Sequence, residues 1–520
     1  MYRRDLLKAT PLLMAPAIAR ADAKPLRFIP NANLTSIDPI STTALVAAEH
    51  GFLVFDTLYG INDSGDVRPQ MCAGHEVSSD RLTWIFTLRD GLAFHDGEKV
   101  LARDCVSSIR RWGSRDSFGQ AMMASTEELS ALDDRRFQFR LRKPFNQMLY
   151  GLGARNCFIM PDRMAQTPGT QQVKEAIGSG PYRFVPDEWV SGARAGYARF
   201  DRYVPRQEPA SFYAGGKLAK FAKIDWIVQP DAATAAAALQ KGEVEWVEQP
   251  LIDLVPMLRR SSEVKVGVND PFGWQPALQL NHLHPPFNNR KLRQALLPAL
   301  DQKQFIQAVV GDQLDLARLP AGYFCEGQPM ASLAGMEALT RPRDLALARK
   351  LVKESGYAGE KVVMLSPSDR PVYDQQSQLA RALFQELGLN VDFQPMDWGS
   401  VVSRRGSRSP TSQGGWSTFN TALDGITIQN PGSNFALRGS GDKAWFGWPD
   451  DPKLESLRAA WFDAPDLAAQ KALAEQVQAQ AFDSVIYLPL GQFFQPTAYR
   501  SNISGFVRSP LAIFWNVGRS

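Results

Sequence analysis

The chain has 520 residues, 44% hydrophobic and 22% charged, so it is long enough for two or three lobes. It contains no run of eighteen or more apolar residues, which argues against a membrane span. The net charge is +4, half of it contributed by residues 1–23, and this near-balance argues against a nucleic-acid-binding protein. The one dense basic patch is expected to be a solvated loop, with a ligand contact as the alternative: Arg404, Arg405 and Arg408.

Residues 1–23 are typical of an export signal. The pair Arg3-Arg4 precedes a weakly apolar stretch, and Ala21-Asp22-Ala23 is an A-x-A cleavage pattern. The pair resembles a twin-arginine signal, although Tyr2 and Leu6 stand where such signals have Ser or Thr and Phe, and a Sec signal is the alternative. No cysteine follows the cleavage pattern, so we expect a periplasmic protein without a lipid anchor.

The first third of the chain predicts two strands and a helix. Residues 81–89 alternate between apolar and polar side chains, which is typical of a strand with one buried face. Apolar side chains along one face of residues 99–112 predict a helix. A second alternating strand over residues 137–141 should stop at Pro144, since proline cannot donate a hydrogen bond to a sheet.

Strands and helices alternate in the rest of the chain. Asp231 is placed to cap a helix that ends at Gly242, and Asn289 precedes a helical face that reaches Phe305 and should kink at Pro298. Two more helices and a strand are predicted over residues 344–355, 374–387 and 389–393. The fold class is therefore α/β (mixed α+β), with mixed sheets flanked by helices.

The sequence contains no catalytic, metal or cofactor motif that we can identify. The G-x-S-x-G turn and the Gly-rich phosphate loops are missing, and the close pair His282 and His284 has no evident third ligand. We expect no enzyme activity, no metal and no cofactor, and a periplasmic hydrolase is the alternative of another class. The four cysteines are too dispersed for a metal site and leave disulfide pairing open: Cys72, Cys105, Cys157 and Cys325.

Six segments, in chain order, resemble the peptide, nickel and opine class of extracellular solute-binding proteins of ABC transporters. The most specific runs from Leu82 to Glu98, LTWIFTLRDGLAFHDGE, and is followed by the ARDCV of a helix. The other five span residues 31–39, 178–184, 238–244, 286–296 and 487–490. The resemblance therefore covers essentially the whole chain after the signal.

The resemblance implies a bilobed periplasmic binding protein whose hinge the chain crosses twice. Lobe I would comprise residues 24–55, 180–268 and 488–520, with a family-specific subdomain at 56–179, and lobe II would comprise 269–487. The crossings are expected near Asn269-Asp270-Pro271 and Tyr487-Leu488-Pro489. Ligand would shift the equilibrium from open to closed lobes.

The resemblance also implies a function. The protein would be the substrate-binding subunit of an ABC importer, a monomer that captures a di- or oligopeptide between its lobes and delivers it to the permease and ATPase complex. An opine-like amino-acid conjugate, a sugar or a metal chelate is the alternative solute. A chaperone or sensor role on the same scaffold also stays open.

The resemblance implies five uncharged ligand-binding residues, which form one backbone segment and two aromatic positions. Ala32, Asn33 and Leu34 correspond to the segment that pairs with a bound peptide backbone, and Trp398 and Trp416 to tryptophans of the cleft. An aromatic wall offers a large rigid contact without requiring one particular ligand side chain. For each tryptophan, a place in the core is the alternative.

The charged contacts depart from the family pattern. The aspartate that pairs with a peptide's α-ammonium is expected three residues after Trp416, where this chain has Phe419, and the next carboxylate is Asp424. We therefore include Asp424 as a candidate ammonium contact. Arg404, with Arg405 and Arg408 beside it, is a candidate partner for a ligand carboxylate.

Overall fold

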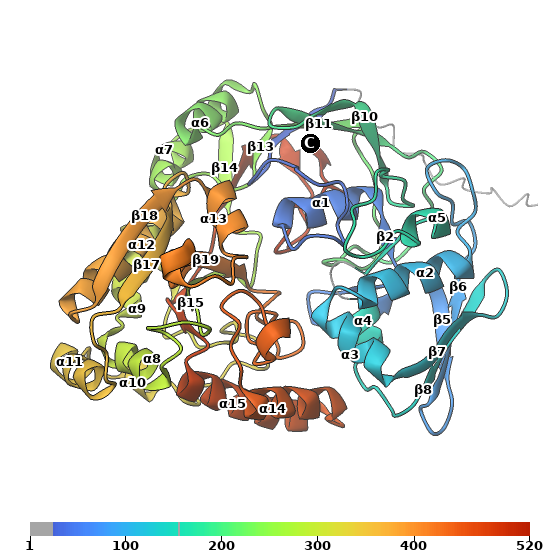
Figure 1. Ribbon diagram of the computed structural model, residues 1–520. Helices are drawn as coiled ribbons and strands as arrows, with labels where there is room; N and C mark the ends of the chain where they lie inside the picture. The colour runs from blue at the N-terminus through green and yellow to red at the C-terminus, as the bar shows by residue number, and fades with distance from the viewer. Residues whose placement is uncertain (1–23, 154–156) are drawn as a thin grey trace, which may run out of the picture.

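The computed structural model describes residues 24–153 and 157–520, and its two largest sheets lie in two lobes (Figure 1). The predicted signal peptide, residues 1–23, lies outside the described residues. No helix in the described ranges is long and apolar enough to cross a membrane. The architecture is the mixed α/β class that the sequence predicts.

The lobe I sheet has seven strands from three separate parts of the chain. Its central strand β1 (Leu26–Ile29) is parallel to β12 (Lys223–Ile227) and β13 (Trp246–Val247). The C-terminal strand β22 (Thr497–Arg500) lies antiparallel between β13 and β14 (Val264–Gly267). The chain therefore returns to lobe I after lobe II. The sheet is completed at its other edge by β10 (Tyr182–Val190) and β11 (Arg194–Arg199).

Two lobe I helices show how the sequence determines the burial of one helix and the ends of another. α1 (Leu45–Val54) is apolar apart from Glu49 and His50, and nine of its ten residues are buried. α6 (Ala232–Lys241) begins and ends as predicted, since the Asp231 carboxylate accepts a hydrogen bond from Thr234 N and Gly242 adopts a left-handed φ of +73°.

A separate four-stranded antiparallel sheet forms the subdomain, in the order β5-β6-β8-β7. The predicted alternating strand is β6 (Thr83–Leu88), whose Trp84, Phe86 and Leu88 are buried. The predicted helix is α2 (Ala102–Gly113), three residues shorter at its start than expected. The remaining main elements are β5 (Cys72–Val77), β7 (Thr126–Ala131), β8 (Arg136–Leu141), α3 (Ser117–Ser125), α4 (Met148–Gly153) and α5 (Asp162–Ala165).

The lobe II sheet is built around β15 (Trp274–Leu280), which pairs with β19 (Thr418–Asp424) over its whole length. β17 (Lys361–Pro367) lies parallel between β19 and β18 (Asn390–Met396). The longer helices of this lobe are α8 (Arg290–Leu296), α9 (Gln302–Val310), α11 (Leu345–Glu354), α12 (Pro371–Glu386), α13 (Trp398–Arg404), α14 (Pro452–Asp463) and α15 (Leu467–Ser484), and α10 (Glu337–Thr340) is a single turn.

The helix predicted to run from Asn289 to Phe305 with a kink is two helices. α8 gives way to a short 3-10 turn at Leu297–Ala299, and α9 starts after Asp301, whose carboxylate accepts hydrogen bonds from Lys303 N and Gln304 N. Pro298 removes a backbone donor, and the Asp301 cap begins a second helix, so the helix is interrupted rather than kinked.

The second crossing between the lobes comes later than predicted. β20 (Tyr487–Pro489) and β21 (Gln492–Phe493) both pair with β15 and so belong to the lobe II sheet. The chain re-enters lobe I only at Thr497, the start of β22. The boundary predicted at residue 488 is therefore wrong by several residues, because a strand-like sequence does not reveal which sheet it joins.

Candidate ligand-binding cleft

A cavity of about 440 Å³ lies between the subdomain and lobe II, within the size range of small-molecule sites. We call it the inter-lobe cavity. Its lobe I and subdomain side includes residues of the 40–43 segment and of the start of α3, and its lobe II side includes Arg405 and residues of the loop from Ile426 to Phe446. In Figure 1 this loop and α13 face α1 and α3 across the middle of the molecule.

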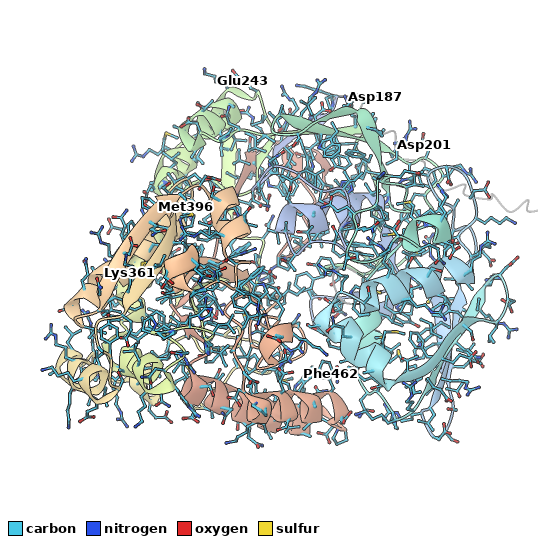
Figure 2. All side chains as sticks on the ribbon, in the orientation of Figure 1. Asp187, Asp201, Glu243, Lys361, Met396 and Phe462 are labelled. Carbon is cyan, nitrogen blue, oxygen red and sulfur yellow. The ribbon has the colours of Figure 1, made fainter. Side chains whose placement is uncertain are left out.

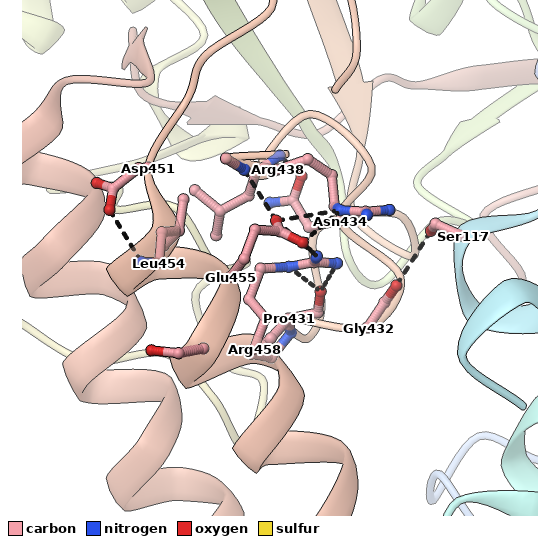
Figure 3. Close-up of polar contacts among 12 residues, drawn as sticks. Ser117, Pro431, Gly432, Asn434, Arg438, Asp451, Leu454, Glu455 and Arg458 are labelled. Carbon is pink, nitrogen blue, oxygen red and sulfur yellow. Dashed lines mark hydrogen bonds and ion pairs between the residues drawn. The ribbon is translucent and has the colours of Figure 1, made fainter. Parts of the chain in front are cut away.

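The subdomain side is fixed by the start of α3. The Asp116 carboxylate caps this helix by accepting hydrogen bonds from Phe118 N (2.8 Å) and Gly119 N (3.0 Å). Ser117 Oγ donates across the lobes to Gly432 O at 3.3 Å (Figure 3). One short segment therefore lines the cavity and contacts the opposite lobe.

The lobe II side is a loop that α14 holds in place. Arg458 donates twice to Pro431 O, at 3.1 and 2.7 Å, and also pairs with Glu455, which in turn pairs with Arg438 (Figure 3). Burial lowers the pKa of the Arg458 guanidinium to about 10, while the Glu455 charge opposes this shift. Because the loop is tied to a helix, its cavity-lining residues have a fixed position.

Next to the cavity, aromatic rings join the subdomain to lobe II. Phe462, at the end of α14, lies near the subdomain in Figure 2, and its ring contacts Phe118 at 5.1 Å and Phe145 at 5.8 Å between centroids. Lys143 Nζ and Asp463 form an ion pair at 2.7 Å beside them. The two lobes therefore meet through packed rings as well as through polar contacts.

Arg405 is the basic side chain of the 404–408 patch that lines the cavity. It follows α13 as its C-terminal cap, and burial lowers the pKa of its guanidinium from its ordinary value to about 10. Four rings surround its Cζ atom, at 4.6 to 5.8 Å from the centroids: Phe446, Trp398, Trp445 and Phe419. We call Arg405 and these rings the Arg405 cage.

The predicted carboxylate partner Arg404 is bound within lobe II. Its guanidinium donates to Gly414 O (3.0 Å), Gly415 O (3.1 Å) and the side-chain oxygen of Gln394 (2.6 Å). It does not line the inter-lobe cavity. Arg408 is exposed and pairs with Asp442. Of these three arginines, Arg405 is therefore the one that lines the inter-lobe cavity.

The two predicted tryptophans occupy different surroundings. Trp416 is completely buried, packs against Phe419 and Trp448, and donates from Nε1 to Arg405 O at 3.1 Å. This is the core position that the sequence left open. Trp398 is half-buried at the start of α13 and belongs to the Arg405 cage.

The segment from Ala32 to Leu34 lies against the β10–β11 hairpin. Asn33 Oδ1 accepts a hydrogen bond from Gly192 N at 2.8 Å, and Leu34 O accepts one from Trp189 Nε1 at 3.3 Å. Its neighbour Asn31 accepts a hydrogen bond from Arg370 of lobe II at 3.3 Å. The segment is thus next to a contact between the lobes but outside the cavity lining.

Asp424 lies at the end of β19, next to the cavity wall. Its carboxylate accepts hydrogen bonds from Thr427 N (3.0 Å) and Thr427 Oγ1 (2.9 Å). Thr427 and Ile426 line the cavity. Asp424 therefore shapes the turn that carries two lining residues.

Sequence reasoning missed the contribution of α3. Asp116 followed by Ser117 is a recognisable N-cap, but nothing in the sequence indicates that this helix start faces lobe II. Sequence reasoning also left the thiols open, and all four cysteines are free and buried. Among the described residues, no group of three or more His, Cys, Asp or Glu side chains could hold a metal ion.

Comparison with known proteins identifies the family. Residues 66–445 match the model of bacterial extracellular solute-binding proteins, family 5 Middle. The chain belongs to this family. It is 37% identical, over 100% of its length and 99% of the relative's, to the "Probable peptide ABC transporter periplasmic-binding protein y4tO" of Sinorhizobium fredii.

Two solved structures show the same fold as this solute-binding protein. One is the periplasmic binding protein DppA of Helicobacter pylori in complex with peptide STSA, with a TM-score of 0.80 and 20% identity over 96% of this chain and 98% of that one. The other is AgaA of A. tumefaciens R10 in complex with agropinic acid, with a TM-score of 0.79 and 18% identity over 96% and 99%. The predicted fold is confirmed.

Proposed function

We propose that this family 5 protein is the periplasmic subunit of an ABC importer and that it captures a short peptide in the inter-lobe cavity. The observation that carries the proposal is a small-molecule-sized cavity lined from both sides by separate lobes. The full-length relative named as a peptide-transporter protein and the related fold with a bound peptide support this choice of solute.

An opine-like amino-acid conjugate is the second candidate. The Arg405 cage presents a guanidinium to the cavity, and a conjugate with several carboxylates would satisfy it. The related fold of AgaA, titled as a complex with agropinic acid, supports this alternative. Family membership favours solute binding over the periplasmic hydrolase that the sequence left as an alternative.

The partners and the route of export belong to the same proposal. The solute-binding protein would be exported by the twin-arginine-like signal in residues 1–23, with Sec as the alternative, and remain a periplasmic monomer without a lipid anchor. It would deliver its solute to a permease and ATPase complex in the inner membrane. It would need no cofactor, metal or nucleic acid.

A thermal-shift screen of the purified protein tests the solute. Di- and tripeptides, opines, oligosaccharides and a nickel–histidine chelate would each be added in excess, because a ligand that binds only the folded state raises the melting temperature. We expect the largest shift from a peptide. Shifts from opines or chelates with none from any peptide would overturn the proposed solute.

Asp424 is proposed as the contact for the peptide ammonium, because it is the first carboxylate after Phe419 and adjoins the cavity wall. The substitution Asp424→Ala should weaken the binding of a peptide with a free N-terminus far more than that of its N-acetylated form. Equal losses for both peptides would remove Asp424 from this role and leave it as the residue that orients Thr427.

A further inference from the structure

Among the residues that the structure describes, none is an anionic partner for the guanidinium of Arg405. Its Nε atom is buried without a hydrogen-bond partner, and no carboxylate among the described residues lies within ion-pair distance of it. Desolvation of a charge is costly unless another charge or hydrogen bonds compensate for it. The aromatic cage compensates only in part, because a ring face attracts a cation more weakly than a carboxylate does.

Other buried arginines of this chain show the usual arrangement. Arg111 forms an ion pair with Asp38 and donates to two carbonyl oxygens. Arg293 makes three hydrogen bonds to backbone carbonyls, and Arg458 pairs with a carboxylate and a carbonyl. Each of these guanidiniums is satisfied inside the protein. Arg405 differs from them because it opens onto the inter-lobe cavity.

The lining of the cavity is cationic as a whole. It contains four basic side chains, Arg115, Arg405, Arg438 and Lys443, and one acidic side chain, Asp116, among the described residues. The Asp116 carboxylate already caps α3, and Arg438 pairs with Glu455. Phe419, at the place where the family resemblance predicts a carboxylate, lies under the Arg405 guanidinium instead. A neutral or cationic solute would leave this charge uncompensated.

We infer that the inter-lobe cavity selects an acidic solute, one of whose carboxylates is received by Arg405 inside its aromatic cage. The inference rests on the proposed function and narrows it to peptides, or peptide-like conjugates, with a net negative charge. A planar guanidinium matches a carboxylate through paired N–H···O bonds, and the surrounding rings exclude water from the pair. The carboxylate can be the C-terminus or an acidic side chain of the solute.

Calorimetric titration of matched dipeptides tests the inference. Ala-Glu, Ala-Gln, Ala-Lys and C-amidated Ala-Glu differ in one group each, so they separate the side-chain carboxylate from the terminal one. We expect Ala-Glu to bind most tightly, with at least one of its two carboxylates contributing about 30-fold in affinity. In Arg405→Met, the affinity for Ala-Glu should fall about 30-fold or more. It should then equal the affinity for the peptide that lacks the carboxylate bound by Arg405, which is either Ala-Gln or C-amidated Ala-Glu.

Two further variants separate recognition from folding. Arg405→Lys retains the charge but not the planar fork, so its affinity should lie between those of wild type and Arg405→Met. Arg408→Met removes an exposed arginine of the same patch that also lies over a ring, and should bind Ala-Glu as wild type does. Circular dichroism would verify that each variant is folded before titration.

The outcomes distinguish this inference from the proposed function. Equal affinity of wild type for Ala-Glu and Ala-Gln would overturn the selection of an acidic solute and leave peptide binding intact. Unchanged binding of Ala-Glu by Arg405→Met would overturn the role of Arg405 and likewise leave peptide binding intact. If no peptide binds but an acidic amino-acid conjugate binds in an Arg405-dependent way, the inference stands and the peptide assignment fails. If neither class binds, both are overturned.

Discussion

The buried ion pair between Asp38 and Arg111 should be a principal support of the junction between lobe I and the subdomain. The two side chains are 0% and 1% exposed and pair in bidentate fashion, at 2.6 and 3.1 Å. The Asp38 carboxylate also accepts hydrogen bonds from Ile40 N (3.1 Å) and Val173 N (3.0 Å). Four donors therefore converge on one carboxylate that has no contact with water.

The substitution Asp38→Asn tests this support with almost no change in volume. The asparagine retains one acceptor oxygen, but its NH₂ group would face donors, and the Arg111 guanidinium would remain buried without a counter-charge. Removing one partner of a buried pair costs about 3–5 kcal/mol. We expect a loss of that size in the free energy of unfolding, measured by urea titration at pH 7.

A double-mutant cycle provides the control. Adding Arg111→Met to Asp38→Asn removes the uncompensated charge, so the double variant should be more stable than Asp38→Asn alone. Asp66→Asn, which breaks the exposed pair with Arg68, should have no measurable effect. A loss below about 1 kcal/mol in Asp38→Asn, or a double variant no more stable than the single one, would refute the reasoning.

The remaining predictions concern one buried carboxylate, two tryptophans and the charge across the cavity. Burial, assisted by the charge of Asp424, raises the pKa of Asp270 to about 7, so between pH 4 and 7 the folded state binds a proton that the unfolded state, with its ordinary pKa of 3.8, has released. The free energy of unfolding should therefore fall as the pH rises from 4 through 7. Urea titrations of Asp270→Asn should show a flatter dependence on pH, and an unchanged dependence would argue against this role of Asp270. Trp416→Ala should cost about 3–5 kcal/mol of stability because the ring is fully buried. Trp398→Ala, which removes one ring of the Arg405 cage, should cost less stability but reduce the affinity for an acidic ligand about 3- to 10-fold. A larger loss of stability in Trp398→Ala than in Trp416→Ala would contradict this assignment of Trp416 to the core and Trp398 to the cage. Arg115 on the subdomain side and Lys443 on the lobe II side are both cationic and should repel each other across the cavity. Added salt screens this repulsion, so it should favour closure of the ligand-free protein and reduce its radius of gyration in X-ray scattering. An unchanged radius would count against repulsion across the cavity.

Local signals predicted the elements of the fold well. The alternation in β6 and the caps Asp231, Gly242 and Asn289 each depend on neighbours within a few residues, and each lies where the sequence predicts. The errors concern long-range pairing. β20 and β21 join the lobe II sheet through contacts with β15, more than two hundred residues away in the chain, and no local pattern specifies that choice.

The candidate site was harder to predict for the same reason. Adjacent residues of a helix point about 100° apart, so the choice between Arg404 and Arg405 depends on where α13 ends and on how it packs. The start of α3 enters the cavity only because the subdomain meets lobe II through contacts such as Ser117 with Gly432. Sequence identifies these residues as caps and charges but does not bring them together.

The position of Trp416 shows how a residue outside the cavity can still determine its chemistry. Its Nε1–H donates to the carbonyl oxygen of Arg405, and its ring packs against Phe419, which lies under the Arg405 guanidinium. The indole thus fixes both the backbone that carries the charge and one face of the cage around it. A charge that is held in advance loses little conformational entropy when a solute arrives, so more of the attraction to a carboxylate is available for closing the lobes.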